Sequence, residues 1–241
     1  MQHDLDFDLF QFANRFEAAQ KLLEILPTAK MCEEEWLVVA ISSGGVPIAN
    51  TICMKLGLNY DLLFTEPVVA PNNSEYAVAM VSETEEIVIH TELIEAFGIS
   101  LDFIYGEAQR KYEEKILKYV YKYRKGDLIG SLKNKNVLLV DEGCETGLTV
   151  LTSIKTAISA GAKSVSFATP VIASNVFTSL DTVTDEIFTV YRVANFVDTA
   201  FYYQDIKPLD FEGVKAIIDN SPFYMPFQKI GEMKVCSIPL K

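Results

Sequence analysis

Runs of hydrophobic residues alternate along the chain with helical patterns of hydrophobic and polar positions. The segment Phe10–Leu26 places hydrophobic side chains on one face of a helix, and Pro27 ends that pattern. Trp36–Ile41 is a short hydrophobic run that predicts a buried strand. The glycine turn after this run opens a second helical pattern, which ends at Gly57. The first quarter of the chain therefore predicts a leading helix followed by a strand, a turn and a helix.

The rest of the chain continues this alternation of strands and helices. Shorter strands are predicted at Asp61–Thr65, Ala77–Val81 and Glu86–His90, with a turn-rich segment at Pro67–Ser74. A long helical pattern follows at Leu101–Lys125. The pattern then predicts three more strands separated by two helices, in the order Val137–Val140, a helix ending at Ala160, Ser164–Pro170, a helix near Ala173–Leu180, and Glu186–Val190.

This order of elements predicts the fold class. Strands that alternate with helices at this spacing form a mostly parallel sheet, because parallel neighbours need crossover connections. We therefore expect an α/β fold with a central parallel sheet flanked by helices. The length of 241 residues fits a single domain, residues 1–241. The tail beyond Tyr203 has weak periodicity and predicts no element.

Composition narrows the range of functions. The formal net charge of -12 disfavours nucleic-acid binding, because such a surface repels phosphate backbones. The hydrophobic runs are too short to span a bilayer, and the first residues show no basic-then-apolar leader, so we expect no membrane association. The four cysteines are widely scattered, with no C-x-x-C pair and no suggestion of a disulfide framework, which fits a cytoplasmic protein. The two histidines, His3 and His90, disfavour multi-histidine metal sites and most serine triads.

One loop carries the strongest chemical signal. Asp141–Thr149 follows a hydrophobic strand and precedes a helix, the place where parallel sheets bind ligands. Backbone N–H groups and two hydroxyls in its second half are suited to one phosphate group at a helix N-terminus. Asp141 and Glu142 can accept hydrogen bonds from two vicinal sugar hydroxyls. A capped strand-to-helix turn without a ligand is the alternative interpretation.

The loop and its surroundings resemble a known family. The run Val137–Thr149, VLLVDEGCETGLT, resembles the phosphoribosyl pyrophosphate signature of type I phosphoribosyltransferases. The similarity extends to the group of predicted bacterial phosphoribosyltransferases, which five further segments resemble. They are the opening helix at Phe12–Leu26, the pyrophosphate loop at Ile41–Ala49, the Pro-x-Asn-x-Glu segment at Pro71–Val78, the approach to the signature strand at Tyr123–Gly126, and Phe201–Asp205 near the C-terminus.

The resemblance implies a function and the residues that perform it. The fold would carry a small hood made of the N-terminal segment, the C-terminal segment or both, about residues 1–30 and 200–241. The enzyme would transfer ribose 5-phosphate from phosphoribosyl pyrophosphate to a nucleobase-like nitrogen acceptor, with Mg²⁺ as cofactor. Asp141 and Glu142 would be catalytic and would act on the metal only indirectly, and a homodimer is common in this fold. The substrate-binding residues would be Ser43, Gly44, Gly45, Glu145, Thr146, Gly147, Leu148 and Thr149. The acceptor would lie against the hood or Val193–Tyr203, where Phe196, Phe201 and Tyr202 would stack on it.

Several residues depart from the family pattern, and they favour a second hypothesis. Ser42 and Ser43 occupy positions where the family usually has proline and arginine, and Glu66 precedes Pro67 where a basic residue is usual. Glu145 adds a negative charge beside the phosphate cradle. A non-catalytic protein that binds phosphoribosyl pyrophosphate or a nucleotide for regulation is therefore the alternative. A third hypothesis is an interaction protein with an acidic surface and only a capped turn at the loop.

Overall fold

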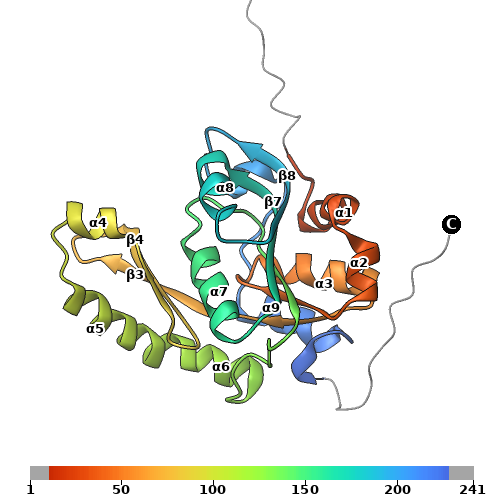
Figure 1. Ribbon diagram of the computed structural model, residues 1–241, viewed down its shortest axis with the longest axis horizontal. Helices are drawn as coiled ribbons and strands as arrows, with labels where there is room; N and C mark the ends of the chain where they lie inside the picture. Colours follow the sequence, from red (N-terminus) through yellow and green to blue (C-terminus); the bar gives the residue numbers. More distant parts are fainter. Residues whose placement is uncertain (1–10, 228–241) are drawn as a thin grey trace, which may run out of the picture.

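A five-stranded parallel sheet organises the protein. The structure, a computed structural model, describes residues 11–227 (Figure 1). All neighbouring strands of the sheet run in the same direction, so their carboxyl ends lie at one edge. The strands follow the order β2 (Asn59–Leu62), β1 (Trp36–Ala40), β6 (Asn136–Val140), β7 (Ser164–Ala173) and β8 (Glu186–Val193).

Helices cover both faces of this sheet. In β1, Val38 and Ala40 face one hydrophobic core while Leu37 and Val39 face the other, as the two-residue repeat of a strand requires. The first core contains side chains of α1 (Arg15–Ile25), α2 (Thr28–Glu33), α3 (Gly45–Leu56) and α9 (Phe211–Asn220). The second contains side chains of α7 (Leu148–Ser159) and α8 (Ser174–Leu180). The α/β fold class and the central parallel sheet predicted from the sequence are confirmed.

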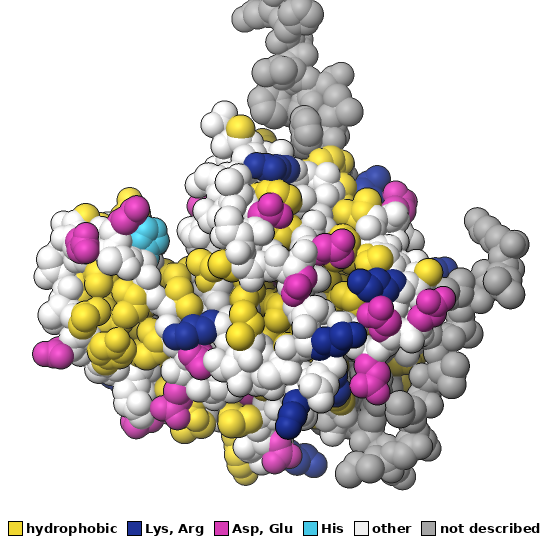
Figure 2. All heavy atoms as spheres, in the orientation of Figure 1, with side chains coloured by type: hydrophobic (Ala, Val, Ile, Leu, Met, Phe, Trp, Pro, Cys, Tyr) yellow, Lys and Arg dark blue, Asp and Glu magenta, His cyan; other side chains and the backbone are white. Residues whose placement is uncertain are grey.

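Residues 65–124 form an arm that projects to one side of the sheet (Figure 1). Its antiparallel sheet has the order β3–β4–β5. Six of the exposed large hydrophobic side chains belong to the arm, Tyr76, Phe97, Leu101, Tyr105, Leu117 and Tyr121. Hydrophobic side chains are prominent over this part of the surface (Figure 2). The elements of the arm are β3 (Thr65–Ala70), β4 (Asn73–Ser82), β5 (Ile87–Ile89), α4 (Thr91–Ala96), α5 (Leu101–Lys111), a π-helical turn (Tyr112–Ile116) and α6 (Leu117–Arg124).

Two local predictions were wrong at prolines. The segment Pro67–Ser74 belongs mostly to β3 and β4 rather than to a turn. Pro67 is tolerated because β3 is an edge strand, where a missing N–H breaks no inner ladder. Strand β7 continues past Pro170 to Ala173. It can do so because its pairing with β6 already ends at Ala168, so Pro170 removes no donor from that ladder.

The tail beyond Tyr203 also contains a helix that the sequence pattern did not predict. Helix α9 begins after Asp210, whose carboxylate accepts a hydrogen bond from the N–H of Gly213. Val214 and Ile218, four residues apart, are its buried side chains. Two apolar positions and an interior glycine give too weak a periodicity to identify such a short helix.

The two segments predicted to form the hood lie next to each other. Phe12 donates its N–H to the carbonyl of Tyr202 and accepts a hydrogen bond from the N–H of Gln204. Residues 1–10 and 228–241 of these segments lie outside the described part of the chain, as does His3. The hood and the single domain over residues 1–241 stay predictions.

Two further expectations from the sequence concern membrane-spanning helices and cysteines. None of the helices within residues 11–227 is both long and apolar enough to cross a membrane. Cys32 is disulfide-bonded, which the scattered cysteine spacing did not predict, whereas Cys53 and Cys144 are free thiols.

Candidate active site

Two loops meet at the carboxyl edge of the central sheet. One follows β1 and leads into α3; the other follows β6 and leads into α7. Because β1 and β6 are neighbours in register, with Ala40 opposite Val140, both loops leave the sheet side by side. The sheet thus brings the predicted pyrophosphate loop against the predicted ribose-phosphate loop.

Glycines allow this close approach. A Cβ atom on Gly45 would lie 2.5 Å from the carbonyl oxygen of Val140, and one on Gly44 would lie 1.9 Å from the carboxyl carbon of Glu142. A side chain at either position would push the two loops apart or displace the Glu142 carboxylate. Gly45 is therefore required for the backbones of the two loops to approach each other, and Gly44 leaves space for the Glu142 carboxylate.

Asp141 is buried where the loops meet. Its Oδ1 accepts hydrogen bonds from the hydroxyl of Ser42 at 2.5 Å and from the N–H of Glu142 at 2.8 Å. Burial raises the pKa of Asp141 from its ordinary value of 3.8 to about 7, although the Ser42 hydrogen bond opposes this rise. The carboxyl group is thus positioned by the neighbouring loop and titrates near neutral pH.

Glu142 is half-buried and lies over Gly44. Its Oε2 forms an ion pair with Nε of Arg15 at 2.5 Å, and its backbone carbonyl accepts a hydrogen bond from the hydroxyl of Tyr203 at 2.7 Å. Arg15 also donates to the carbonyl oxygen of Lys207 at 2.9 Å. Segments from both ends of the described chain thereby fix one catalytic candidate.

The second half of the loop forms the start of α7. Gly147 has φ +75°, and a Cβ there would lie 2.8 Å from Val176, so this position requires glycine on two counts. Glu145 and Thr146 are exposed, whereas Leu148 is buried and can offer a ligand only its backbone. Thr149 is half-buried in the first turn of the helix. This arrangement presents backbone N–H groups and hydroxyls to the surface beside two carboxylates.

Cys144 anchors the loop rather than reacting. Its N–H donates to the carbonyl of Val171, and its carbonyl accepts from the N–H of Ala173. Burial and the nearby Asp141 carboxylate raise the pKa of its thiol, which keeps the sulfur protonated.

The two arginines of the predicted helix Leu101–Lys125 lie away from the two loops. Arg110 pairs with Glu107 and Glu114 on the exposed face of the arm, and Arg124 is buried against Glu83. Neither guanidinium supplies positive charge to the loops. Tyr202, predicted to stack on an acceptor, is buried and packs against the rings of Phe196 and Phe201.

Sequence reasoning missed two residues that contact the site, Arg15 and Tyr203. Arg15 is the first residue of α1, and its partner Glu142 is 127 positions away. No local pattern reports a contact over such a separation. The resemblance did include Tyr203, but not its hydrogen bond to the loop.

The comparison with protein families agrees with this geometry. Residues 13–197 match the family described as phosphoribosyl transferase domain. The chain belongs to this family. The phosphoribosyl transferase domain match includes both contacting loops, together with Arg15 and the arm, and it ends before Tyr203 and α9.

One solved structure is similar to this chain in fold, and two curated proteins are similar to it in sequence. The crystal structure of TT1426 from Thermus thermophilus is 25% identical, covers 86% of this chain and 97% of its own, and has a TM-score of 0.69. Two curated Mycobacterium tuberculosis proteins, named "Putative phosphoribosyl transferase" Rv0571c (strain H37Rv) and MT0597 (strain CDC 1551), are each 23% identical over 229 residues, or 95% of this chain. The chain spans about half the length of these curated relatives.

The free energy of unfolding should depend on pH in a way that reveals the burial of Asp141. Because its folded pKa is raised above the value of the unfolded chain, the folded state loses stability as the pH rises from about 4 to about 7. Asp141→Asn does not titrate, so the stability of wild type relative to this variant should fall over that range. Urea unfolding at several pH values measures this difference, and Ser42→Ala should move the transition to higher pH. A constant difference between wild type and Asp141→Asn across this range would contradict the assignment.

Proposed function

We propose that the protein transfers ribose 5-phosphate from phosphoribosyl pyrophosphate to a nucleobase-like nitrogen acceptor. The observation that carries this proposal is the contact between the two loops, with Ser42 bonded to Asp141 and Glu142 lying over Gly44. Phosphate-binding backbone and ribose-binding carboxylates are thereby brought within the reach of one small ligand.

Each half of the site has a role in this reaction. The N-terminus of α7, with Thr146 and Thr149, binds the 5-phosphate through N–H groups and hydroxyls. The N–H groups of Ser43, Gly44 and Gly45 at the start of α3 bind the pyrophosphate. As pyrophosphate leaves, positive charge develops on the ribose, and the carboxylates of Asp141 and Glu142 stabilise it.

The carboxylates of Asp141 and Glu142 are suited to indirect rather than direct binding of Mg²⁺. Within residues 11–227, no three His, Cys, Asp or Glu side chains are grouped so that they could hold a metal ion. Oδ1 of Asp141 and Oε2 of Glu142 already have hydrogen-bonding partners. A magnesium ion would therefore arrive with phosphoribosyl pyrophosphate, bound mainly by phosphate oxygens and water, and would neutralise the leaving group.

Arg15 supplies the positive charge that is missing from the pyrophosphate loop. Its side chain is largely buried, and its guanidinium lies at the Glu142 carboxylate, next to Gly44. We propose that it orients Glu142 in the free protein and attracts the pyrophosphate in the complex.

Replacing Arg15 should therefore weaken donor binding. We expect Arg15→Gln to lower the affinity for phosphoribosyl pyrophosphate by about ten-fold or more, because a hydrogen bond to a charged group is lost. Lys21→Gln in the same helix removes one positive charge without touching the site, and it should bind like wild type. Calorimetric titration measures both variants, and equal affinities for the two would contradict this role.

The release of pyrophosphate tests the reaction itself. With phosphoribosyl pyrophosphate, Mg²⁺ and a panel of nucleobases, wild type should release pyrophosphate with at least one base, whereas the double variant Asp141→Asn/Glu142→Gln should release none. Donor binding without release for any base would instead support the second candidate, a regulatory protein that binds the donor or a nucleotide. The observation that favours that candidate is the absence of a cationic side chain from the loop at Ser42 and Ser43.

A further inference from the structure

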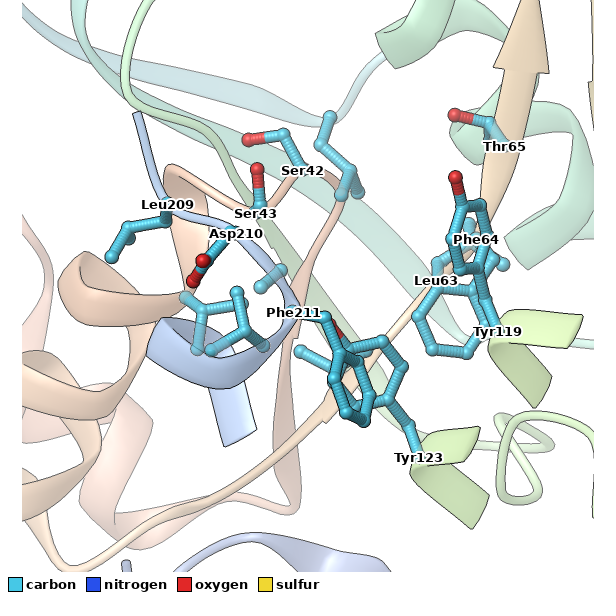
Figure 3. Close-up of a pocket in the computed structure, with 15 residues that line it drawn as sticks. Ser42, Ser43, Leu63, Phe64, Thr65, Tyr119, Tyr123, Leu209, Asp210 and Phe211 are labelled. Atoms are coloured by element: carbon cyan, nitrogen blue, oxygen red, sulfur yellow. The ribbon is translucent and has the colours of Figure 1, made fainter. Parts of the chain in front are cut away.

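A cavity of about 470 Å³ opens beside the pyrophosphate loop (Figure 3). It is bounded by the carboxyl ends of β1 and β2, by α6 of the arm and by the start of α9. No residue of the Asp141–Thr149 loop lines it. Its lining includes Ser42, Ser43, Phe64, Tyr123, Asp210 and Phe211.

Four aromatic rings form one wall of this cavity. Tyr123 stacks on Phe64 with ring centroids 5.5 Å apart, and it contacts Phe211 at 4.9 Å and a tilt of 53°. Tyr119 contacts Phe64 from the same helix as Tyr123. Rings held by one another in this way offer a preformed surface on which a planar molecule can stack. The hydroxyl groups of Ser43 and Thr65 supply hydrogen-bonding groups among the other lining residues.

The charged side chains around the cavity favour a neutral ligand over an anionic one. Lys122 and Arg124 lie 4.7 Å from the ring centroids of Phe211 and Phe64, but neither side chain lines the cavity. Among the described residues that line it, Asp210 alone is charged, and its carboxylate caps α9. An anionic ligand would meet this carboxylate without a compensating cation, whereas a neutral or cationic ligand would not be repelled.

The position of the cavity also separates it from the acceptor site of the proposed reaction. The cavity lies on the β2 side of the pyrophosphate loop, whereas the Asp141–Thr149 loop lies on the β6 side. In an in-line displacement the acceptor approaches the ribose from the side opposite the leaving group, and this step of the argument rests on the proposed function. A molecule in the cavity would lie beyond the leaving group and could not be the acceptor.

We propose that this cavity binds an uncharged planar heteroaromatic ring, of the size of a nucleobase, as a ligand separate from the phosphoribosyl donor. The volume falls in the range of small-molecule sites that are mostly apolar with a few polar groups. Ser42 connects the two sites, because it lines the cavity and its hydroxyl also donates to Asp141.

Binding of adenine, a neutral planar heterocycle, tests the location of this site. In calorimetric titrations we expect wild type to bind adenine and Tyr123→Leu to bind it about ten-fold more weakly or worse, because a stacking ring is lost. Tyr121→Ala removes an exposed tyrosine from the same helix, 72% exposed and outside the cavity, and should leave the affinity unchanged. Asp141→Asn/Glu142→Gln should still bind adenine, even if it no longer binds the donor.

Nicotinamide and nicotinate, which differ in charge but hardly in size, test the chemistry. Wild type should bind nicotinamide about five-fold or more tightly than nicotinate, because Asp210 repels the carboxylate. Asp210→Asn should remove this preference, and it keeps the helix cap because asparagine caps as well as aspartate. The proposal is overturned if wild type binds neither adenine nor nicotinamide, if Tyr121→Ala weakens binding as much as Tyr123→Leu, or if Asp141→Asn/Glu142→Gln abolishes adenine binding.

Discussion

Arg124→Met is expected to destabilise the protein by about 3–5 kcal/mol, because it leaves the Glu83 carboxylate buried without a cation. Nη2 of Arg124 lies 2.6 Å from both carboxylate oxygens of Glu83, and both side chains are almost completely buried. The same carboxylate accepts hydrogen bonds from the N–H groups of Phe64 and Ile129. This ion pair therefore joins α6 to the turn that follows β4 and to the segments at both ends of the arm.

A matched variant on the same long helix separates burial from charge. Arg110→Met also breaks ion pairs with glutamates, but these are exposed to solvent, so its effect on the free energy of unfolding should be far smaller than that of Arg124→Met. Adding Glu83→Gln to Arg124→Met should recover part of the loss, because no unpaired charge is then buried. Urea unfolding measures all three variants. Equal unfolding free energies for Arg124→Met and Arg110→Met would contradict the structural role of the buried pair.

Gly45→Ala is expected to have the second largest effect, a loss of about 1–3 kcal/mol together with loss of donor binding. The added Cβ would lie 2.5 Å from the Val140 carbonyl oxygen, a backbone atom that cannot rotate away. The start of α3 or the end of β6 must shift, and either movement separates the two loops of the site.

A glycine in the arm provides the control for this substitution. Gly106 lies within α5, and a Cβ there would meet nothing within 4 Å. Gly106→Ala should stabilise the protein by about 0.5–1 kcal/mol through helix propensity, with donor binding unchanged. Thermal unfolding and calorimetric titration compare the two variants. Gly45→Ala with wild-type stability and affinity would show that the loops do not require this close approach.

The sequence predicted those parts of the fold that depend on neighbouring residues. Trp36–Ile41 and Val137–Val140 are uninterrupted hydrophobic runs, and each run predicts a strand that is buried on both faces. The turn residue Gly147, with φ +75°, carries its conformational requirement itself. The covered parallel sheet and the position of both loops after their strands follow from such local signals and from the rules of crossover connections. The order of the strands in the sheet was not predicted from the sequence.

The remaining features depend on contacts between distant residues. Pro67 is a residue type typical of turns. It nevertheless belongs to a strand, because it pairs with Met80 across a hairpin. From the sequence, Arg124 belongs to the basic end of a helix, which is typical of an exposed position. In the structure it is buried, because it pairs with Glu83, which lies 41 positions away. Arg15 reaches the site in the same way, through Glu142. Such pairings are set by tertiary packing, which periodicity along one chain does not encode.

The most direct test of the central claim is a calorimetric titration of phosphoribosyl pyrophosphate, in the presence of Mg²⁺, into wild type and into Asp141→Asn/Glu142→Gln. The variant Glu113→Gln/Glu114→Gln removes the same two charges from adjacent positions on the arm and serves as the control. We predict that wild type and the control bind the donor with equal affinity, whereas the loop variant binds it at least about a hundred-fold more weakly, because two ribose contacts are lost. Equal binding by all three proteins, or no binding by wild type, would contradict the assignment of Asp141–Thr149 as the ribose-phosphate loop.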